Sequence, residues 1–210
     1  MVLRPLKQDE LKEIFDETAQ KIINYYLDRA VKFQPELMEG QKELPIQVPK
    51  EHAEQWLAQA LGAQSVGAGS YPVDVYLPGK FGADIKVLSW GKGKKISGET
   101  SLAQKFEEAG ADLDTLFKNQ QHDEILLGWK KILTNKLRTF VNDMNVNDIY
   151  YFFFLRADTK FYLCGCKVDY EEIRNVKVNK NRTTDKNVFV DDFIDKEYGN
   201  IKIYKAKKRM

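Results

Sequence analysis

One stretch of the chain changes the spacing of its apolar residues from that of a helix to that of a strand, and this limits the folds open to it. Val73, Val75 and Leu77 alternate with polar residues. After the segment Pro-Gly-Lys-Phe-Gly, Ile85 and Val87 do the same. A period of two predicts strands that bury one face, and the Pro and Gly between them predict a turn. We therefore expect an antiparallel hairpin.

Burial of these apolar residues fixes the register of the hairpin. Side chains in a strand point alternately to its two faces, so the apolar set must share one face and the polar set the other. Asp74 from the first strand then lies on the same face as Asp84 and Lys86 from the second. This register requires a turn with an odd number of residues, or a bulge, between Leu77 and Ala83.

Helical spacing marks the segments around the hairpin. We expect one long amphipathic helix over residues 9–33, then a loop, then a helix that begins at Pro49 and ends at Gly62. A further helix should cover residues 124–144. The polar segment 90–98 follows the hairpin, and its residues 90–95 are expected to form a flexible basic loop.

A third helix is expected between that polar segment and residue 124. Ser101 and Gln104 have the spacing of a capping box, in which each side chain satisfies a backbone donor at the start of a helix. The apolar residues that follow continue with helical spacing through Leu113.

The order of the elements predicts the fold class. Strands are expected at residues 148–155 and 161–168, with a final edge strand through Ile201 and Ile203. Helix, helix, strands, helix, helix, strands is typical of an α/β or α+β domain with a central mixed sheet flanked by helices. We expect a single domain with an N-terminal helix and linker, a core and a basic C-terminal segment: residues 1–48, 49–168 and 169–210.

The charge of the whole chain is nearly balanced, with 33 Lys and Arg against 31 Asp and Glu. Residues 174–209 differ, because they hold eleven Lys and Arg against five Asp and Glu. A phosphate-binding surface should draw on this segment. Within it, Lys180, Asn181 and Arg182 are suited to contact base edges or phosphates, although such a run is as typical of an exposed loop.

The N-terminal sequence and the small number of cysteines and histidines exclude several classes of protein and of catalytic site. The N-terminus lacks the apolar run of a signal peptide, and no stretch is long enough to span a bilayer, so we expect a cytoplasmic protein. Cys164 and Cys166 complete no zinc site with His52 or His122, so we expect two reduced thiols. With so few histidines, carboxylates and lysines are left as catalytic groups.

The polar face of the hairpin holds two acids and a lysine, which is the minimum set for metal-assisted hydrolysis of a phosphodiester. That reaction requires an activated water and neutralisation of charge on the transition state and the leaving oxygen. Mg²⁺ supplies both and prefers a few carboxylate ligands while it keeps waters and binds substrate phosphate. We therefore take Asp74 and Asp84 as metal ligands and Lys86 as the group that orients or deprotonates the water.

An acid two residues before a lysine is also a common surface pattern. The chain has three such triplets, at residues 10–12, 84–86 and 158–160. The first belongs to a helix face and the last to a turn, so solvent exposure explains them. The middle triplet differs because it has an apolar central residue, flanking strands and a second acid on the adjoining strand.

Pro72-Val73-Asp74 followed by Asp84-Ile85-Lys86 resembles the PD-(D/E)xK signature of the nuclease superfamily that includes many type II restriction endonucleases. The chain departs from the strictest form because Val73 separates Pro72 from Asp74. The resemblance covers residues 51–168 in element order and implies a restriction-endonuclease-like core. It also implies that Asp74 and Asp84 bind Mg²⁺, that the Ile85 carbonyl adds a ligand, and that Lys86 serves the attacking water.

The resemblance implies a type II restriction endonuclease, a homodimer that cuts double-stranded DNA at a short sequence. Two alternatives stay open. One is a structure-specific nuclease of the same fold, such as a junction resolvase or repair nuclease, which would prefer branched DNA. The other is a non-catalytic DNA- or protein-binding domain in which the acids and Lys86 form only an ion pair, and which would bind no Mg²⁺.

Other residues are secondary candidates, each with an ordinary structural explanation. Gln104 could reach the metal-bound water or DNA, or it could only cap a helix. Glu13 and Glu17 could add an acid to the site, or they could lie on a solvated helix face. Three lysines could hold phosphates from a basic loop after the hairpin, or they could lie in a soluble turn: Lys92, Lys94 and Lys95.

Overall fold

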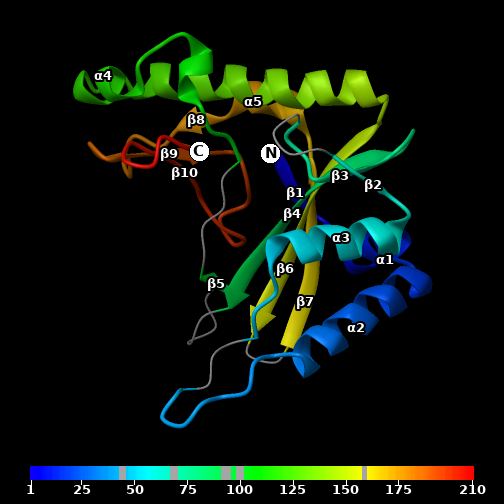
Figure 1. The fold of residues 1–210 in the computed structure, drawn as a ribbon. Helices are drawn as coiled ribbons and strands as arrows, with labels where there is room; N and C mark the ends of the chain where they lie inside the picture. The colour runs from blue at the N-terminus through cyan, green and yellow to red at the C-terminus, as the bar shows by residue number, and fades with distance from the viewer. Residues whose placement is uncertain (43–45, 67–70, 91–95, 98–101, 158–159) are drawn as a thin grey trace. The chain divides into compact units, whose positions relative to one another are not determined.

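The computed structural model describes residues 1–42, 46–66, 71–90, 96–97, 102–157 and 160–210 (Figure 1). Contacts between Cα atoms divide the chain into two compact units, each assembled from segments far apart in the sequence. The terminal unit comprises Met1–Arg4, Thr100–Asn145 and Lys167–Met210. The sheet unit comprises Pro5–Glu99 and Val146–Cys166.

The chain forms a mixed sheet flanked by helices, which confirms the α/β class. In the described part of the chain this sheet has seven strands, in the order β1-β7-β6-β4-β3-β2 with β5 paired to β4. These strands are β1 (Leu3–Pro5), β2 (Gln64–Ser65), β3 (Val75–Leu77), β4 (Phe81–Trp90), β5 (Ile96–Ser97), β6 (Asp148–Ala157) and β7 (Lys160–Val168). Strands β4 and β6 pair in parallel from Phe81↔Asp148 to Ser89↔Arg156. The aromatic and β-branched residues of β6 suit a buried central strand.

The hairpin has the predicted register. Strands β3 and β4 pair antiparallel, with Val75 opposite Ala83 and Leu77 opposite Phe81. The turn between them consists of three residues, which is the odd number that the register requires. Its central residue, Gly79, has a φ of 70°, a conformation that costs glycine little. Val75, Ala83 and Ile85 therefore share the buried face.

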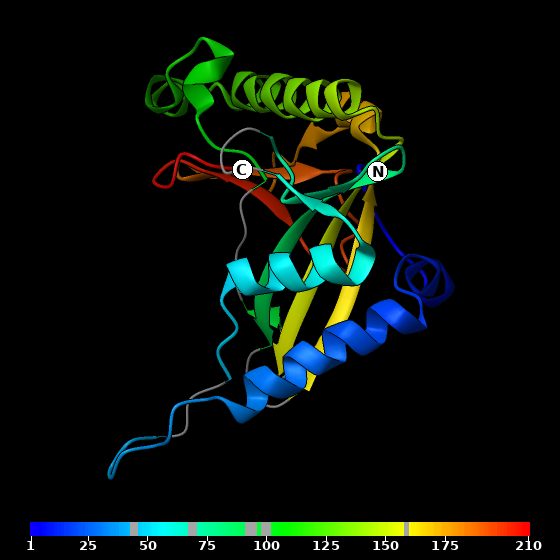
Figure 2. The ribbon, with the colours of Figure 1, turned by 45° about the vertical axis from the view of Figure 1, so that its right-hand side comes forward.

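Two helices of the sheet unit, α2 (Glu17–Lys32) and α3 (Lys50–Leu61), cover the apolar face of the hairpin. Figure 2 shows them side by side along the sheet. Helix α3 follows Pro49 and ends at Gly62, as predicted. The core there is made by apolar side chains from both layers: Ala19, Ile23, Ala53, Leu57, Val75, Ile85, Phe152 and Phe154.

The prediction of one helix over residues 9–33 is wrong, because the chain forms α1 (Gln8–Ile14) and then α2. Asp16 causes the break. Its backbone is extended and its carboxylate accepts a hydrogen bond from the Ala19 amide at 2.8 Å, which makes it the N-cap of α2. The apolar spacing continues across this cap, so spacing alone could not locate it.

Trp90, the first residue of the expected basic loop, instead ends β4. Ile96 and Ser97 form β5, which pairs antiparallel with Trp90 and Ser89 at the end of β4. Ile96 and Ser97 therefore pair with the strand that carries Asp84 and Lys86. The three lysines proposed to hold phosphates lie outside the described residues: Lys92, Lys94 and Lys95.

The terminal unit contains its own antiparallel sheet, in the order β10-β9-β8. Its elements are η1 (Phe106–Ala109), α4 (Leu113–Lys118), α5 (His122–Met144), η2 (Tyr170–Asn175), β8 (Lys177–Val178), β9 (Asn187–Asp191) and β10 (Ile201–Tyr204). The predictions of a helix over 124–144 and of a final edge strand are confirmed. No helix in the described part of the chain is long and apolar enough to cross a membrane.

The predicted third helix, from a capping box at Ser101 and Gln104, is wrong. Gln104 lies in an isolated bridge with Arg209, and Lys105 has a φ of 63°, which a helix does not tolerate. A short 3₁₀ turn, η1, follows, and Asp112 then caps α4 through the Thr115 amide. Ser101 lies outside the described residues. Gln104 therefore opens no helix.

Gly128→Ala should destabilise the protein, although Gly→Ala in the middle of a helix usually stabilises it by about 0.5–1 kcal/mol. A Cβ atom at Gly128 in α5 would lie 2.6 Å from two ring atoms of Phe106, whose side chain is only 1% exposed. Overpacking of this kind costs roughly 1–3 kcal/mol. Thermal unfolding should show a lower Tm. Asn135→Ala, on the exposed side of α5, is the matched control and should leave Tm unchanged or slightly higher.

Candidate active site

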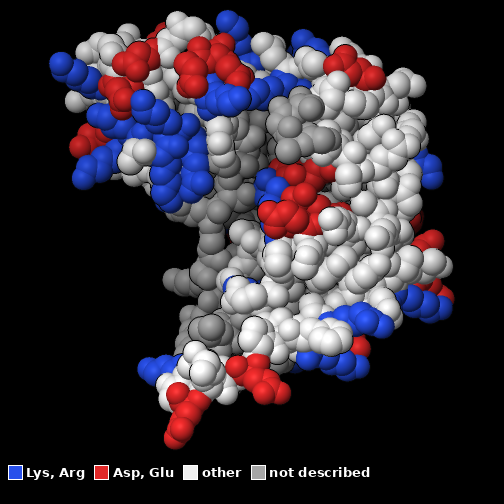
Figure 3. Space-filling view, in the orientation of Figure 1, with Lys and Arg blue, Asp and Glu red and all other residues white. Residues whose placement is uncertain are grey.

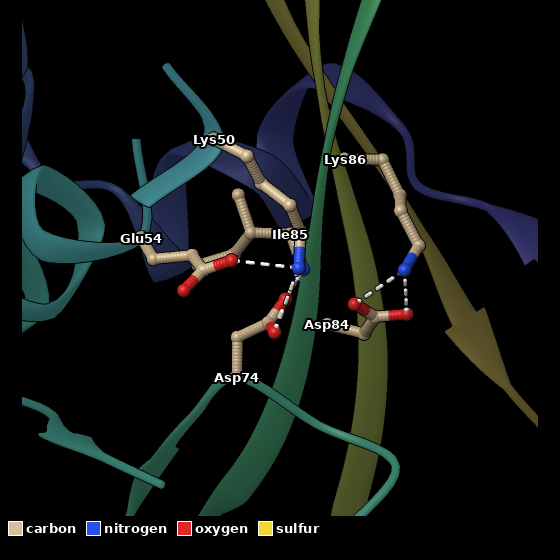
Figure 4. Close-up of polar contacts among 6 residues, drawn as sticks. All are labelled: Lys50, Glu54, Asp74, Asp84, Ile85 and Lys86. Atoms are coloured by element: carbon tan, nitrogen blue, oxygen red, sulfur yellow. Dashed lines mark hydrogen bonds and ion pairs between the residues drawn. The ribbon is translucent and has the colours of Figure 1, made fainter. Parts of the chain in front are cut away.

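Strand β4 places Asp84 and Lys86 on the face opposite to the helix-covered core (Figure 4). The Lys86 Nζ atom lies 2.5 Å from Asp84 Oδ2 and 2.7 Å from Asp84 Oδ1, so the ammonium contacts both carboxylate oxygens. Their side chains are only 14% and 11% exposed. The alternation of β4 thus places the acid and the lysine on one face, as its sequence predicted.

Asp74 joins this pair from the adjoining strand. It occupies a bend immediately before β3, and its Oδ2 atom accepts a hydrogen bond from the Ile85 amide at 2.7 Å. The pairing of β3 with β4 begins at Val75↔Ala83, so Ile85 lies beyond the paired residues. The Asp74 carboxylate accepts the hydrogen bond that a longer β3 would otherwise accept from Ile85. The backbone of β4 therefore fixes the position of this carboxylate.

The carboxyl groups of Asp74 and Asp84 influence each other, and their pKa values move in opposite directions. Burial raises the pKa of Asp84 most, Lys86 opposes it, and the contact with Asp74 raises it further, to about 7. Burial alone would also raise the pKa of Asp74. The neighbouring Asp84 carboxyl group and the hydrogen bonds from the Ile85 amide and Lys50 outweigh that effect and lower it. A proton therefore binds to Asp84 more readily than to Asp74, and Asp74 stays ionised.

Helix α3 adds a second lysine and a third acid that the sequence did not single out. Lys50 Nζ lies 2.7 Å from Glu54 Oε1 and 3.1 Å from Asp74 Oδ1. Burial would lower the pKa of Lys50, but the hydrogen bonds and charges of these two acids outweigh it and raise that pKa. Figure 4 shows the Lys50 ammonium pointing to Asp74 from the side opposite to Lys86.

The sequence gives only a weak signal for the pair of Lys50 and Glu54. Lys50 and Glu54 have the i,i+4 spacing of a helical ion pair, and Glu54 follows the buried Ala53. The acids that the sequence suggested instead, Glu13 and Glu17, are exposed. Glu17 lies 3.8 Å from Lys21, an ordinary pair on the surface of α2.

The charges of this group do not balance within it. Glu54, Asp74 and Asp84 are acids, and Lys50 and Lys86 are the bases that contact them. Burial is the largest cause of the raised pKa of Asp84, Lys86 opposes it, and the charge of Asp74 raises that pKa further. The two adjacent carboxyl groups therefore repel each other when both are ionised. A divalent cation would relieve that repulsion.

The donor set fits Mg²⁺ better than a metal that needs a full protein cage. Within the described ranges, no group of three or more His, Cys, Asp and Glu residues is arranged to hold a metal ion. Mg²⁺ is commonly bound through one or two carboxylates, and water and substrate phosphate supply the remaining ligands. Asp74 and Asp84 meet that requirement. Cys164 and Cys166 are not joined by a disulfide in the part of the chain that the structure describes.

Several predicted residues belong to the other unit. Gln104, Lys180, Asn181 and Arg182 lie in the terminal unit, whereas Asp74, Asp84, Ile85 and Lys86 lie in the sheet unit. Lys180 and Asn181 are exposed, and Lys180 Nζ lies 3.9 Å from Asp123. The contacts of the site itself are thus made entirely by the sheet unit.

Comparison with protein-family models, with curated proteins and with solved structures finds no match for this chain. The roles of the site residues therefore rest on their own geometry and chemistry: Asp74, Asp84, Lys86, Lys50 and Glu54.

Proposed function

We propose that the protein is a Mg²⁺-dependent endonuclease that hydrolyses phosphodiester bonds in double-stranded DNA. The observation that carries the proposal is the gathering of two acids and a lysine in one place: Asp84 with Lys86 at 2.5 Å, and Asp74 held by the amide of the next residue, Ile85. Acids that destabilise each other are costly to retain in a fold, and their concentration at one place is typical of functional sites. The geometry thus favours a site over a structural ion pair.

The proposal includes a restriction-endonuclease-like core. In support, Asp84 lies on β4 and Asp74 directly precedes β3, the antiparallel neighbour of β4, and β4 has a parallel neighbour, β6, that follows a long helix in the chain. Helix α3 precedes the hairpin and contributes Glu54 and Lys50 to the same place. This element order is the one that the resemblance to the PD-(D/E)xK superfamily implies.

Each residue has a distinct role in the proposed reaction. Asp74 and Asp84 would hold Mg²⁺, which supplies charge neutralisation at the scissile phosphate and lowers the pKa of water when it is bound. The Ile85 amide fixes the Asp74 carboxylate through Oδ2, and Lys50 contacts its other oxygen, Oδ1. Asp84 fixes the Lys86 ammonium, which can orient the attacking water and stabilise negative charge on the transition state.

The biological role within this proposal is type II restriction, with a homodimer that cuts both strands at a short site. Incubation with long DNA of mixed sequence and Mg²⁺ should give discrete fragments from the wild-type chain and none from Asp84→Ala. Random degradation would contradict sequence-specific restriction, and faster cutting of branched than of linear DNA would favour a structure-specific nuclease. Equal cutting by Asp84→Ala would contradict the catalytic proposal as a whole.

Lys50→Met is expected to tighten Mg²⁺ binding several-fold. The Lys50 ammonium contacts Asp74 and Glu54, so it competes for the negative charge that would attract the metal ion. The Lys50 side chain is 45% exposed, so its removal should change Tm little. Calorimetric Mg²⁺ titration would measure the effect, with Lys80→Met in the exposed hairpin turn as a control for loss of one positive charge. Weaker binding by Lys50→Met than by Lys80→Met would contradict the competition.

A further inference from the structure

A cavity of about 560 Å³ in the terminal unit lies where α5, η2 and β8 meet, and we call it the basic cavity. Each of these three elements contributes one cation to its lining: Lys130 from α5, Arg174 from η2 and Lys177 from β8. Ile173 and Val176 are buried, which leaves Arg174 and Lys177 on the exposed side of the chain. The packing of three elements thus gathers three cations around one cavity.

The three cations form no ion pair with an acid among the residues that the structure describes: Lys130, Arg174 and Lys177. The Lys130 Nζ atom donates a hydrogen bond to the Arg174 carbonyl oxygen at 2.9 Å, a neutral partner that leaves its charge unmatched. Burial lowers the pKa of Lys130, and the charge of Asp123 only partly opposes this. Partial burial of a cation without an acid beside it costs free energy, and an anion in the cavity would offset that cost.

Two acids also line the basic cavity, and one of them is already engaged. Glu172 Oε1 accepts a hydrogen bond from Asn175 Nδ2 at 3.0 Å, and Glu172 Oε2 lies 3.4 Å from the amino group of Met1. The hydrogen bond from Asn175 is the largest cause of the lowered pKa of Glu172, and the charge of Arg174 adds to it. Asp192 is exposed and forms no ion pair in the described part of the chain. Three cations against two acids leave the lining positive even without the Met1 amino group.

The surrounding surface of the terminal unit is also basic. Strand β8 pairs with β9, and Figure 3 shows Lys and Arg side chains gathered where Figure 1 labels β9 and β10. Residues 174–209, which include Arg174 and Lys177, hold eleven Lys and Arg against five Asp and Glu. Summed positive charge of this kind attracts anions and raises their local concentration. The ligand expected in the basic cavity is therefore an anion.

We propose that the basic cavity binds the phosphate group of a phosphate ester. Phosphate has more oxygens than a carboxylate and carries up to two negative charges, so it can meet three cations at once. The Arg174 guanidinium can bind two of its oxygens as a fork, while Lys130 and Lys177 act as point charges. Sites for small molecules have volumes of about 300–1,000 Å³, so the cavity leaves room for the rest of the ester. The inference goes beyond the proposed nuclease activity, whose residues lie in the sheet unit.

The test is an NMR titration of the full-length ¹⁵N-labelled protein with inorganic phosphate, in EDTA and at constant ionic strength. The backbone amides of residues 175–177 should shift and saturate. Arg174→Gln/Lys177→Gln should weaken this binding at least about tenfold, because two charge-assisted hydrogen bonds to the anion are lost. The control, Lys118→Gln/Lys186→Gln, removes the same charge from exposed residues of the terminal unit that do not line the cavity. Its phosphate affinity should stay within about twofold of the wild-type value, because solvent and salt screen distant charges.

Two further probes identify the source of the phosphate: a nucleoside 5′-monophosphate and a short DNA duplex without terminal phosphates. Saturable shifts of the same amides with the monophosphate, and none with the duplex, would assign the cavity to a free nucleotide. Shifts with the duplex that Arg174→Gln/Lys177→Gln reduces would assign it to a phosphate of the DNA backbone. Either result supports the proposal, whereas no saturable shift with inorganic phosphate, the monophosphate or the duplex would overturn it.

Lys130→Gln separates ligand binding from packing, since glutamine keeps a donor for the Arg174 carbonyl but removes the charge. This variant should bind phosphate several-fold more weakly with little change in Tm. A lower Tm with unchanged phosphate affinity would overturn the place of Lys130 in the site and show that it only caps η2. Equal phosphate affinities of Arg174→Gln/Lys177→Gln and its control would overturn the proposal as a whole. DNA cleavage in Mg²⁺ is a separate measurement, so its absence would contradict the nuclease proposal and leave the basic cavity supported.

Discussion

Asp84→Asn should raise the Tm of the metal-free protein at pH 8 by roughly 5–10 °C, the shift expected for a few kcal/mol in a chain of this size. The folded-state pKa of Asp84 is raised from its ordinary value of 3.8 to about 7, with burial as the largest cause. The folded protein therefore binds this proton more tightly than the unfolded chain. Ionisation of Asp84 costs stability as the pH rises, and an amide in its place removes that cost.

The pH dependence tests this explanation. Stabilisation by Asp84→Asn should be complete above about pH 7, should decrease between pH 7 and 4, and should vanish where Asp84 is protonated in both states. Asp74→Asn is the matched contrast, since the pKa of Asp74 is lowered and its ionised form stabilises the fold. That variant should lower Tm at pH 8. Thermal unfolding in EDTA at several pH values should show a higher Tm for Asp84→Asn and a lower Tm for Asp74→Asn at pH 8. A change in Tm for Asp84→Asn that does not depend on pH would contradict the account.

Lys86→Met should slow DNA cleavage by roughly 10²–10⁴-fold, the usual contribution of a positioned acid or base. It should not weaken Mg²⁺ binding, because the loss of an ammonium 2.5 Å from Asp84 makes the site more negative. The variant therefore separates hydrolysis from metal binding. Single-turnover cleavage and calorimetric Mg²⁺ titration would measure the two effects.

Lys86→Arg serves as the control for charge. It keeps the positive charge beside Asp84 but changes its shape and cannot readily give up a proton, so its activity should lie between those of Lys86→Met and the wild type. Cleavage by Lys86→Met within tenfold of the wild-type rate would contradict the role of Lys86. Loss of Mg²⁺ binding together with activity would show that Lys86 only supports the fold of the site.

The sequence predicted the part of the site that depends on local alternation. Burial of Val75 and Ile85 on one face of the hairpin is enough to bring Asp74 towards Asp84, and the register bears this out. The contact of Lys50 with Asp74 could not be predicted in this way. It depends on how α3 packs across the sheet, which joins residues 24 positions apart through tertiary contacts.

The errors in the predicted helices have a common cause. Apolar spacing describes which face of a segment is buried, but single residues decide where a helix begins and ends. Asp16 starts a new helix within a continuous apolar pattern, and Lys105 adopts a left-handed conformation inside a segment with helical spacing. Cap chemistry at Asp16 was visible in the sequence, whereas the conformation of Lys105 had no local signal.

Cleavage of a supercoiled plasmid by the wild-type chain and by Asp84→Asn, in Mg²⁺ and in EDTA, tests the central claim most directly. The Tm of each protein, measured in the same buffers, shows that both are folded. The account predicts nicked or linear DNA only from the wild type with Mg²⁺, and uncut DNA from a variant that is as stable or more stable. Mg²⁺-dependent cutting by Asp84→Asn at the wild-type rate, or cutting by the wild type in EDTA, would contradict it.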